Sequence, residues 1–378
     1  MSDAAIEATA AAFRVVGNAS SLHGAGRQAR RMVEEARERV ARALGALPGE
    51  VVFTSGGTEA NNLAIKGLFW SRRDEVATRT RIITLPVEHH AVLDAVDWLA
   101  QHEGAVVDEV PVDAEGLLDL DAFRSLVERN PDDIALVTVM WANNEVGSVQ
   151  PIAEVAAIAN EFGIPVHSDA VQAVGALPVD FGSTGLAALT LSGHKLGGPI
   201  GVGALLLGRD RKPTPILHGG GQERDVRSGT LAMPVIVGLG VAVEQAVTNR
   251  EADSVRIQDL RDRLIAGVEA LDVHATLRGH RTHRLPGNAH FTFEGCEGDA
   301  LLMLLDAQGV QVSTGSACTA GIPQPSHVLL SMGLDAAAAR GALRFSLGRS
   351  SSQADVDALL RALPDVVGRA RRAGMVKR

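Results

Sequence analysis

Hydrophobic and polar residues alternate with two different periods between Glu50 and Arg209. Short runs rich in β-branched residues indicate strands at residues 50–57, 81–87, 104–112, 133–144, 164–170 and 187–195. Amphipathic segments between them indicate helices at residues 58–70, 90–102, 119–130 and 151–163. This alternation predicts an α/β fold in which a mostly parallel sheet is covered by helices on both faces.

The pattern changes after Gly208. A glycine-rich, charged loop precedes a long helical region from Met233 to Leu271, with a break expected near Asn249. Strand-like segments at 287–295, 310–317 and 341–348 then alternate with helical segments at 299–309 and 352–373. We therefore predict two domains: a large one at residues 12–250, and a smaller C-terminal α/β domain at residues 251–378 that also includes 1–11.

Composition narrows the class of protein. The 378 residues, of which 46% are hydrophobic, are enough to bury a large core. Two cysteines argue against a disulfide framework, and a net charge of -9 argues against nucleic acid as the main partner. We recognise no signal peptide and no apolar run long enough to span a bilayer, so we expect a cytoplasmic protein with no membrane partner and no direct nucleic-acid partner.

The segment "TSGGTEANN" contains a candidate phosphate site. Gly56, Gly57 and Thr58 follow a predicted strand and open a predicted helix, where backbone N–H groups and the helix dipole attract an anion. A tight turn with an ordinary helix cap is the alternative interpretation.

Two charged residues end later strands. Asp169, with Gln172 three residues further on, ends an apolar strand, and a carboxylate at that depth needs a cationic partner unless it caps the next helix. Lys195 follows another strand, next to Ser192 and His194. An amine at this edge of a sheet, near a carboxylate and a phosphate turn, indicates a Schiff-base lysine, although an exposed loop lysine is the default without those neighbours.

Together these parts describe a site for pyridoxal 5'-phosphate. Gly57 and Thr58 would bind the phosphate, Lys195 the aldehyde carbon, and Asp169 the protonated ring nitrogen. His89, in "PVEHHAVLD", is placed to lie over a flat ring and to move protons. Asn144, in "MWANNEVG", would donate to the ring hydroxyl or to a substrate carboxylate.

The segment "STGSACTAG" places Cys318 among small residues that build no core. This setting suits a reactive thiol, and a small residue tolerated in a turn is the alternative. The other cysteine, Cys296, is expected to have a packing role.

Nine motifs in order resemble the cysteine desulfurases, the NifS/IscS-like group of class-V, fold-type I enzymes that use pyridoxal phosphate. They cover nearly the whole chain: "GNASSLHGAGRQAR", "TSGGTEANNLAIKG", "EHHAVLD", "ANNEVGSVQPI", "HSDAVQAVG", "SGHKLGGPIGVGAL", "GGGQERDVRSGT", "STGSACTAG" and "LRFSLGR". The resemblance implies a seven-stranded type of sheet in the large domain. It also implies that the cofactor is bound by Gly57, Thr58, His89, Asn144, Asp169, Gln172, Ser192, Gly193, His194, Lys195 and Thr230.

The same resemblance implies the reaction. L-cysteine would become L-alanine while its sulfur passes to Cys318 as a persulfide, with Lys195 and His89 as the other catalytic residues. Arg344 and Asn144 would bind the substrate, because an Arg fork suits a carboxylate. Thr230 would reach the cofactor phosphate of the other subunit, which implies a homodimer.

The resemblance also implies protein partners that accept the sulfur, such as an iron–sulfur scaffold or a thiolation enzyme. It implies no intrinsic metal, although Cys318 could transiently ligate an iron–sulfur cluster shared with a scaffold. Three points stay open. A selenocysteine lyase or another class-V lyase would share every feature except the demand for Cys318. The Ala-Ala-Thr-Thr-Pro-like segment with which the family opens is missing, because Met1 starts after it, and we expect a start assigned too late. A truncated chain, or loss of this wall of the site, is the alternative, and such a loss would suggest a catalytically weak sulfur-relay or scaffold-binding subunit.

Overall fold

The computed structural model describes residues 1–315 and 325–375. The chain divides into two compact units. Unit 1 comprises Met1–Val110, Asp119–Trp141 and Gln150–Arg250, and unit 2 comprises Pro111–Leu118, Ala142–Val149 and Glu251–Arg378. Each unit is described by itself below.

The N-terminal residues belong to unit 1, so their assignment to the small domain was wrong. Ser2 donates its N–H to the Gly197 carbonyl at 2.8 Å and its hydroxyl to Gln245 Oε1 at 2.8 Å. Helix α1 (Asp3–Phe13) starts from this anchor, with the Ser2 side chain as its N-cap. Such tertiary hydrogen bonds are not visible in the local pattern of a short terminal segment.

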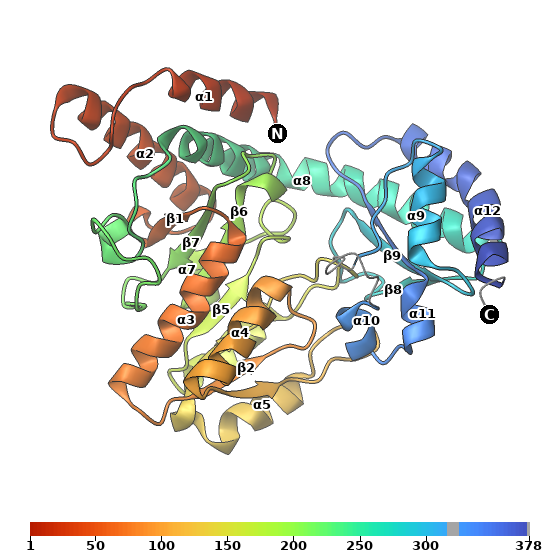
Figure 1. The fold of residues 1–378 in the computed structure, drawn as a ribbon, viewed down its shortest axis with the longest axis horizontal. Helices are drawn as coiled ribbons and strands as arrows, with labels where there is room; N and C mark the ends of the chain where they lie inside the picture. Colours follow the sequence, from red (N-terminus) through yellow and green to blue (C-terminus); the bar gives the residue numbers. More distant parts are fainter. Residues whose placement is uncertain (316–324, 376–378) are drawn as a thin grey trace. The chain divides into compact units, whose positions relative to one another are not determined.

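Unit 1 contains a seven-stranded sheet in the order β1-β7-β6-β5-β4-β2-β3 (Figure 1). The pairs β2–β3, β2–β4, β4–β5 and β5–β6 are parallel, while β7 runs antiparallel to both β1 and β6. The prediction of a mostly parallel, seven-stranded sheet is therefore confirmed. Its strands are β1 (Val51–Thr54), β2 (Arg81–Thr84), β3 (Val106–Glu109), β4 (Ile134–Thr138), β5 (Val166–Asp169), β6 (Ala188–Ser192) and β7 (Gly203–Leu207).

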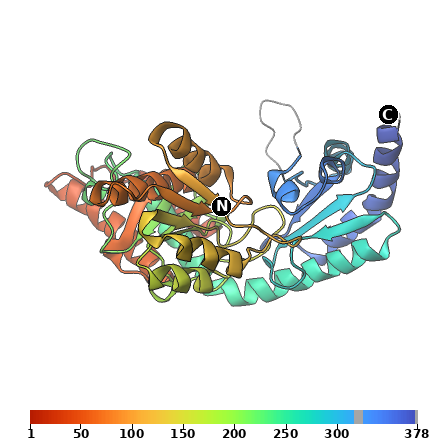
Figure 2. The same cartoon turned by 90° about the horizontal axis from the view of Figure 1, so that it is seen from below.

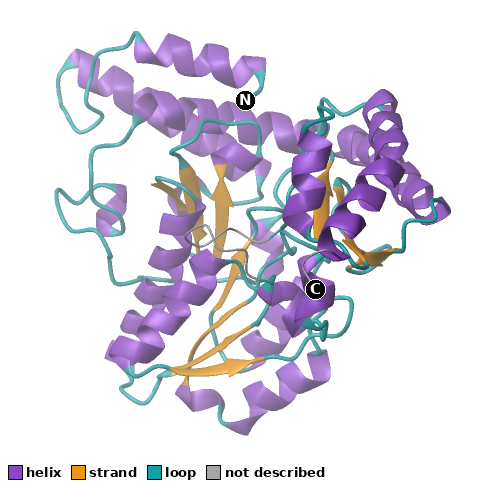
Figure 3. Ribbon diagram, turned by 45° about the vertical axis from the view of Figure 1, so that its right-hand side comes forward, coloured by secondary structure: helices purple, strands orange, loops and turns teal. Residues whose placement is uncertain are grey.

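Helices surround this sheet (Figure 3). Apolar residues of α3, among them Leu63, Ala64 and Leu68, pack with Val52 and Leu205 of the sheet in a buried cluster. Burial of each leucine or valine in this cluster stabilises the fold by roughly 1.5–3 kcal/mol. The elements are α2 (Gly24–Ala43), α3 (Gly57–Glu75), α4 (His90–Glu103), α5 (Leu120–Arg129), α6 (Ile152–Glu161) and α7 (Phe181–Thr184), with short 3-10 helices η1 (Pro48–Glu50), η2 (Pro131–Asp133), η3 (Gly193–Lys195) and η4 (Glu223–Asp225).

Helix α8 (Met233–Ala270) is continuous, so the break predicted near Asn249 was wrong (Figure 2). The polar sequence "TNREADS" that suggested the break carries a helix-propensity penalty of only about 0.7 kcal/mol or less per residue. Buried side chains on both sides of it, Ala246 and Ile257, stabilise the helix through packing. Within the described ranges, no helix is long and apolar enough to cross a membrane.

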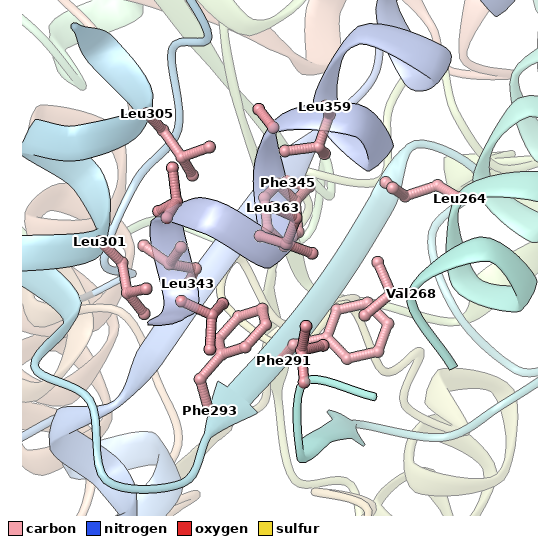
Figure 4. Close-up of a cluster of buried hydrophobic side chains, with 14 of the residues drawn as sticks. Leu264, Val268, Phe291, Phe293, Leu301, Leu305, Leu343, Phe345, Leu359 and Leu363 are labelled. Atoms are coloured by element: carbon pink, nitrogen blue, oxygen red, sulfur yellow. The ribbon is translucent and has the colours of Figure 1, made fainter. Parts of the chain in front are cut away.

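Unit 2 is built around a three-stranded antiparallel sheet in the order β10-β9-β8. The ring centroid of Phe291, on the central strand, lies 6.3 Å from that of Phe293 and 6.2 Å from that of Phe345. The three rings are part of one buried cluster (Figure 4). The elements are β8 (Ala275–Arg278), β9 (Asn288–Phe293), α9 (Gly298–Asp306), α10 (His327–Ser331), α11 (Ala336–Arg340), β10 (Ala342–Ser346) and α12 (Gln353–Met375).

The strand predicted at 310–317 does not form over the residues described there. Only an isolated bridge joins Ser313 to Arg344. Residues 316 and 317 lie outside the described part. Val310 and Val312 contact the core as partly buried residues, so their hydrophobicity reflects packing rather than a sheet position.

Candidate active site

The carboxyl ends of four strands meet at one edge of the unit 1 sheet. Strands β2, β5 and β6 run parallel, and β1 has the same direction as β6 because β7 opposes both. Open α/β sheets bind ligands at this edge. The residues predicted for the cofactor that follow these four strands are Gly57, Thr58, His89, Asp169, Gln172, Ser192, Gly193, His194 and Lys195.

The turn before α3 is shaped for close backbone contact. Gly56 is the N-cap of α3, and no side chain of the described chain caps that helix end. A Cβ on Gly203, at the start of β7, would lie 2.8 Å from the Gly56 carbonyl carbon, so only glycine fits beneath the turn. A Cβ on Gly57 would lie 3.0 Å from Val171, which brings the turn next to the residues after β5. The first N–H groups of a 19-residue helix are thus available to an anion at this edge.

Asp169 lies at the end of β5 and is 7% exposed. It accepts hydrogen bonds from the Asn61 amide at 2.7 Å and from the Val171 N–H at 2.9 Å. Burial raises the pKa of the Asp169 carboxyl, against the opposing effects of these two donors and of the charges of His89 and Lys195. A buried carboxylate in this state favours a cationic ligand group.

Lys195 ends η3, directly after β6, and its side chain is exposed. Its positive charge acts on Asp169 and also on His194, whose pKa is lowered by partial burial and then by this charge. His194 Nδ1 lies 2.9 Å from the Ser192 hydroxyl. The amine therefore lies within electrostatic reach of the buried carboxylate, beside a histidine that favours its neutral form.

His89 is the N-cap of α4. Its Nδ1 accepts the Ala91 N–H at 3.0 Å, so in the neutral ring the proton is on Nε2. The ring is exposed and follows β2 at the same sheet edge. Nε2 is consequently the nitrogen of His89 that can exchange a proton with a ligand.

These residues fit pyridoxal 5'-phosphate. The helix end at Gly57 and Thr58 suits the dianionic phosphate, while the buried Asp169 carboxylate suits a protonated ring nitrogen. Lys195 supplies an amine near the same carboxylate. Gln172 is half-buried in the turn that follows Asp169.

Thr230 is exposed and ends a loop that is anchored by a buried ion pair. Arg37 donates to both carboxylate oxygens of Glu223, at 2.9 and 2.6 Å. Glu223 and the next two residues have φ values of 48°, 58° and 64°, a left-handed conformation that is uncommon outside glycine. Further along the loop, Arg227 donates to Glu59 of α3 at 2.6 Å. Glu223 also accepts the Phe53 N–H of β1 at 2.8 Å. The loop is therefore fixed both to the sheet and to the helix that begins at Gly57.

The substrate-binding candidates lie in unit 2. Arg344, on β10, is half-buried and donates from Nη1 to the carbonyl of Asn144 at 2.8 Å. The structure therefore brings Arg344 and Asn144 together, as both were predicted to bind substrate. Cys318 lies outside the described residues. Cys296 is buried in the unit 2 core, where burial raises the pKa of its thiol, and its packing role is confirmed.

Two residues with direct roles in this geometry were not singled out from the sequence. Asn61 is 1% exposed and holds the Asp169 carboxylate. Its signal was an amide on the otherwise apolar face of a predicted helix. Glu145, next to Asn144, is 3% exposed and lies close enough to Arg344 to raise the pKa of that guanidinium against the effect of burial.

Comparisons with known proteins show the family and the fold of this chain. The family profile "Aminotransferase class-V" matches residues 2–359. The chain is 60% identical over 376 residues to the "IscS-like cysteine desulfurase" of Mycobacterium tuberculosis, covering 99% of this chain and 95% of that protein. It is 44% identical over 356 residues to the "Cysteine desulfurase NifS" of Azotobacter vinelandii, covering 94% and 87%. A solved "NifS-like protein" superposes with a TM-score of 0.90 at 34% identity, covering 97% and 96%.

Proposed function

Because this chain belongs to the class-V aminotransferase family and, within it, to the IscS/NifS-like cysteine desulfurases, we propose that it uses pyridoxal 5'-phosphate to convert L-cysteine to L-alanine. The observation that carries the proposal is the buried Asp169 at the sheet edge where Lys195, His89 and the Gly57 turn also lie. When bound, the cofactor supplies a conjugated ring that accepts electrons from the bonds at the substrate's Cα.

Each of these residues would have its own role in binding the cofactor and the substrate. The N–H groups of Gly57 and Thr58 hold the phosphate, together with Ser192 and His194, and Asp169 keeps the ring nitrogen protonated. His89 would lie over the ring and exchange a proton through Nε2, and Gln172 and Gly193 would complete the cradle. Arg344 binds the substrate carboxylate with Asn144, and Lys195 Nζ takes up the Cα proton. General acid–base steps of this kind contribute roughly 10² to 10⁴ in rate.

Cys318 would receive the sulfur. Its thiolate attacks the sulfur of the substrate, so that an S–S bond forms while the C–S bond breaks, and the electron pair of that bond stays with the carbon. That carbon is then protonated and Lys195 Nζ returns the proton to Cα, which yields L-alanine and a persulfide on Cys318. The persulfide is passed to a thiol of an acceptor protein, such as an iron–sulfur scaffold or a thiolation enzyme.

We propose that the protein works as a homodimer in the cytoplasm. Support comes from Thr230, which ends the anchored loop in an exposed position suited to contact with a second subunit. Thr230 would then complete the phosphate site of that subunit.

The test measures alanine released from L-cysteine by the purified protein with bound cofactor and a thiol reductant, beside the same measurement on L-selenocysteine. We expect alanine from cysteine. In a separate single-turnover sample without reductant, which would cleave a persulfide, we expect one added sulfur on the peptide that contains Cys318. Alanine from selenocysteine alone would indicate a selenocysteine lyase. Absence of both products despite a bound cofactor would contradict desulfurase activity.

A further inference from the structure

The residues on both sides of the segment that carries Cys318 lie against one buried carboxylate. Gly315 precedes this segment and Ser326 follows it, and both belong to unit 2. The Ser326 hydroxyl donates to Glu145 Oε2 at 2.5 Å. A Cβ built on Gly315 would lie 3.2 Å from the same oxygen. Two positions eleven residues apart in sequence therefore meet at Glu145.

The backbone of Glu145 is fixed from two sides. Its N–H donates to Asn143 Oδ1 at 2.8 Å, and its carbonyl accepts the Asn288 amide at 2.9 Å. Gly147, with φ of 83°, lets this turn approach Asn288 so closely that a Cβ would lie 2.7 Å from Oδ1. The carboxylate is thus presented from a rigid turn rather than from a mobile loop.

Gly315 fits a narrow space beside Glu145. Its φ is 87°, and a Cβ there would lie 3.4 Å from His290 Nε2 as well as close to Glu145. His290 is fully buried on the central strand of the unit 2 sheet. Only glycine combines the required backbone conformation with this space, so position 315 requires glycine.

Arg344, the residue predicted to bind the substrate carboxylate, lies near the same residues. The Arg344 N–H donates to the Ser313 carbonyl at 2.6 Å, and the Ser313 N–H donates back at 3.2 Å. The Arg344 side chain donates to the Asn144 carbonyl, one residue before Glu145. The Glu145 charge also opposes the lowering of the Arg344 pKa by burial.

We propose that Glu145 is a positioning residue for sulfur transfer. Its carboxylate binds the Ser326 hydroxyl and lies next to Gly315, on the same turn as Asn144, which binds Arg344. In this role it sets the positions of Gly315 and Ser326, between which Cys318 lies in the sequence, relative to Arg344. In this role Glu145 acts through Ser326 and not on a reacting atom. The proposal rests on the desulfurase function proposed above.

The experiment compares Ser326→Ala, Glu145→Gln and the double variant with the wild-type protein, all with bound cofactor. Two quantities are measured: the rate of alanine formation at saturating L-cysteine, and the change in cofactor absorption on adding L-cysteine. Ser326→Ala should slow alanine formation at least about tenfold, because it removes a buried hydrogen bond to a charged group. The KM for L-cysteine and the change in cofactor absorption on adding L-cysteine both depend on substrate binding. Both should stay within about twofold of their wild-type values. Glu145→Gln keeps a weaker acceptor and should slow the rate about threefold or more.

Non-additivity tests whether the two residues act as a pair. The double variant should be no slower than the slower single variant, since Ser326→Ala already removes the hydrogen bond that Glu145→Gln only weakens. Ser326→Thr keeps a hydroxyl, so its rate of alanine formation should be close to that of the wild-type protein. The matched control is Ser352→Ala, which removes an exposed serine-to-Asp355 bond of 2.8 Å in the same unit and should leave the rate unchanged.

Three results would overturn the role of Glu145: an unchanged rate in Ser326→Ala, independent effects that multiply in the double variant, or no recovery in Ser326→Thr. If Ser326→Ala does not fold, the test rests on Glu145→Gln. A wild-type ratio of the alanine rate to the spectral change in Glu145→Gln would also overturn the role of Glu145. A wild-type protein that forms no alanine contradicts the proposed function instead.

Discussion

Replacing Asn61 with leucine should weaken cofactor binding, although no predicted cofactor contact is altered. Asn61→Leu keeps the approximate volume of the side chain but removes the donor 2.7 Å from Asp169 Oδ2. The other donor to this carboxylate is the Val171 N–H at 2.9 Å. A hydrogen bond to a charged acceptor contributes about 1.5–3 kcal/mol, which corresponds to a cofactor affinity about 10- to 150-fold lower.

The same change should shift the pH dependence of binding. Burial already raises the pKa of Asp169, and loss of a donor to its charged form raises it further. The ionised carboxylate is required to pair with a protonated ring nitrogen. Cofactor affinity should therefore be highest above this pKa and should fall as the pH drops through it. In Asn61→Leu this fall should begin at a higher pH than in the wild-type protein.

The assay titrates apoprotein with pyridoxal 5'-phosphate and follows visible absorption from neutral to acidic pH. Asn160→Leu is the matched control, because this exposed asparagine donates to the Gly185 carbonyl at 3.1 Å, before the amino end of β6. Equal affinities and superimposable pH profiles for wild type and Asn61→Leu would refute the view that Asp169 is held ionised for the ring nitrogen.

Three further predictions concern the proposed catalytic groups. Lys195→Ala should reduce alanine formation by at least about 10²-fold and remove the absorption band of the lysine-bound cofactor, and normal cysteine consumption by this variant would contradict the assignment. Arg344→Ala should raise KM for cysteine about tenfold or more through loss of charge-assisted bonds, so an unchanged KM would exclude it from the substrate site. Cys318→Ser should keep its colour and still respond spectrally to cysteine, while alanine formation collapses. After one wild-type turnover, mass spectrometry should find added sulfur on the Cys318 peptide, and sulfur on the Cys296 peptide instead would refute the assignment.

Several parts of the fold were predictable because their signal is local. Strands β1, β2, β4, β5 and β6 coincide with apolar runs, and glycine or polar residues mark their carboxyl ends. Strand β7 was not predicted separately, since its residues Gly203–Leu207 follow a glycine-rich loop and show no alternation. Its place between β1 and β6 is set by long-range pairing.

Two local predictions failed where packing overrode propensity. The polar sequence near Asn249 suggested a helix end, but buried residues on both sides keep α8 continuous. The β-branched run at Val310–Val312 suggested a strand, but these residues pack on the core beside a sheet whose strands already pair with one another.

The order of motifs along the chain determined the family, the mostly parallel sheet and the types of chemical group at the strand ends, because each of these depends on residue identity and short-range spacing. Only the tertiary structure determined which other residues hold these chemical groups in place. Asn61 reaches Asp169 across 108 positions, and Ser326 reaches Glu145 across 181. Contacts over such separations are created when helices and loops pack, and no local period records them. Burial, which raises the pKa of Asp169, is likewise a property of the packed molecule and not of the residue.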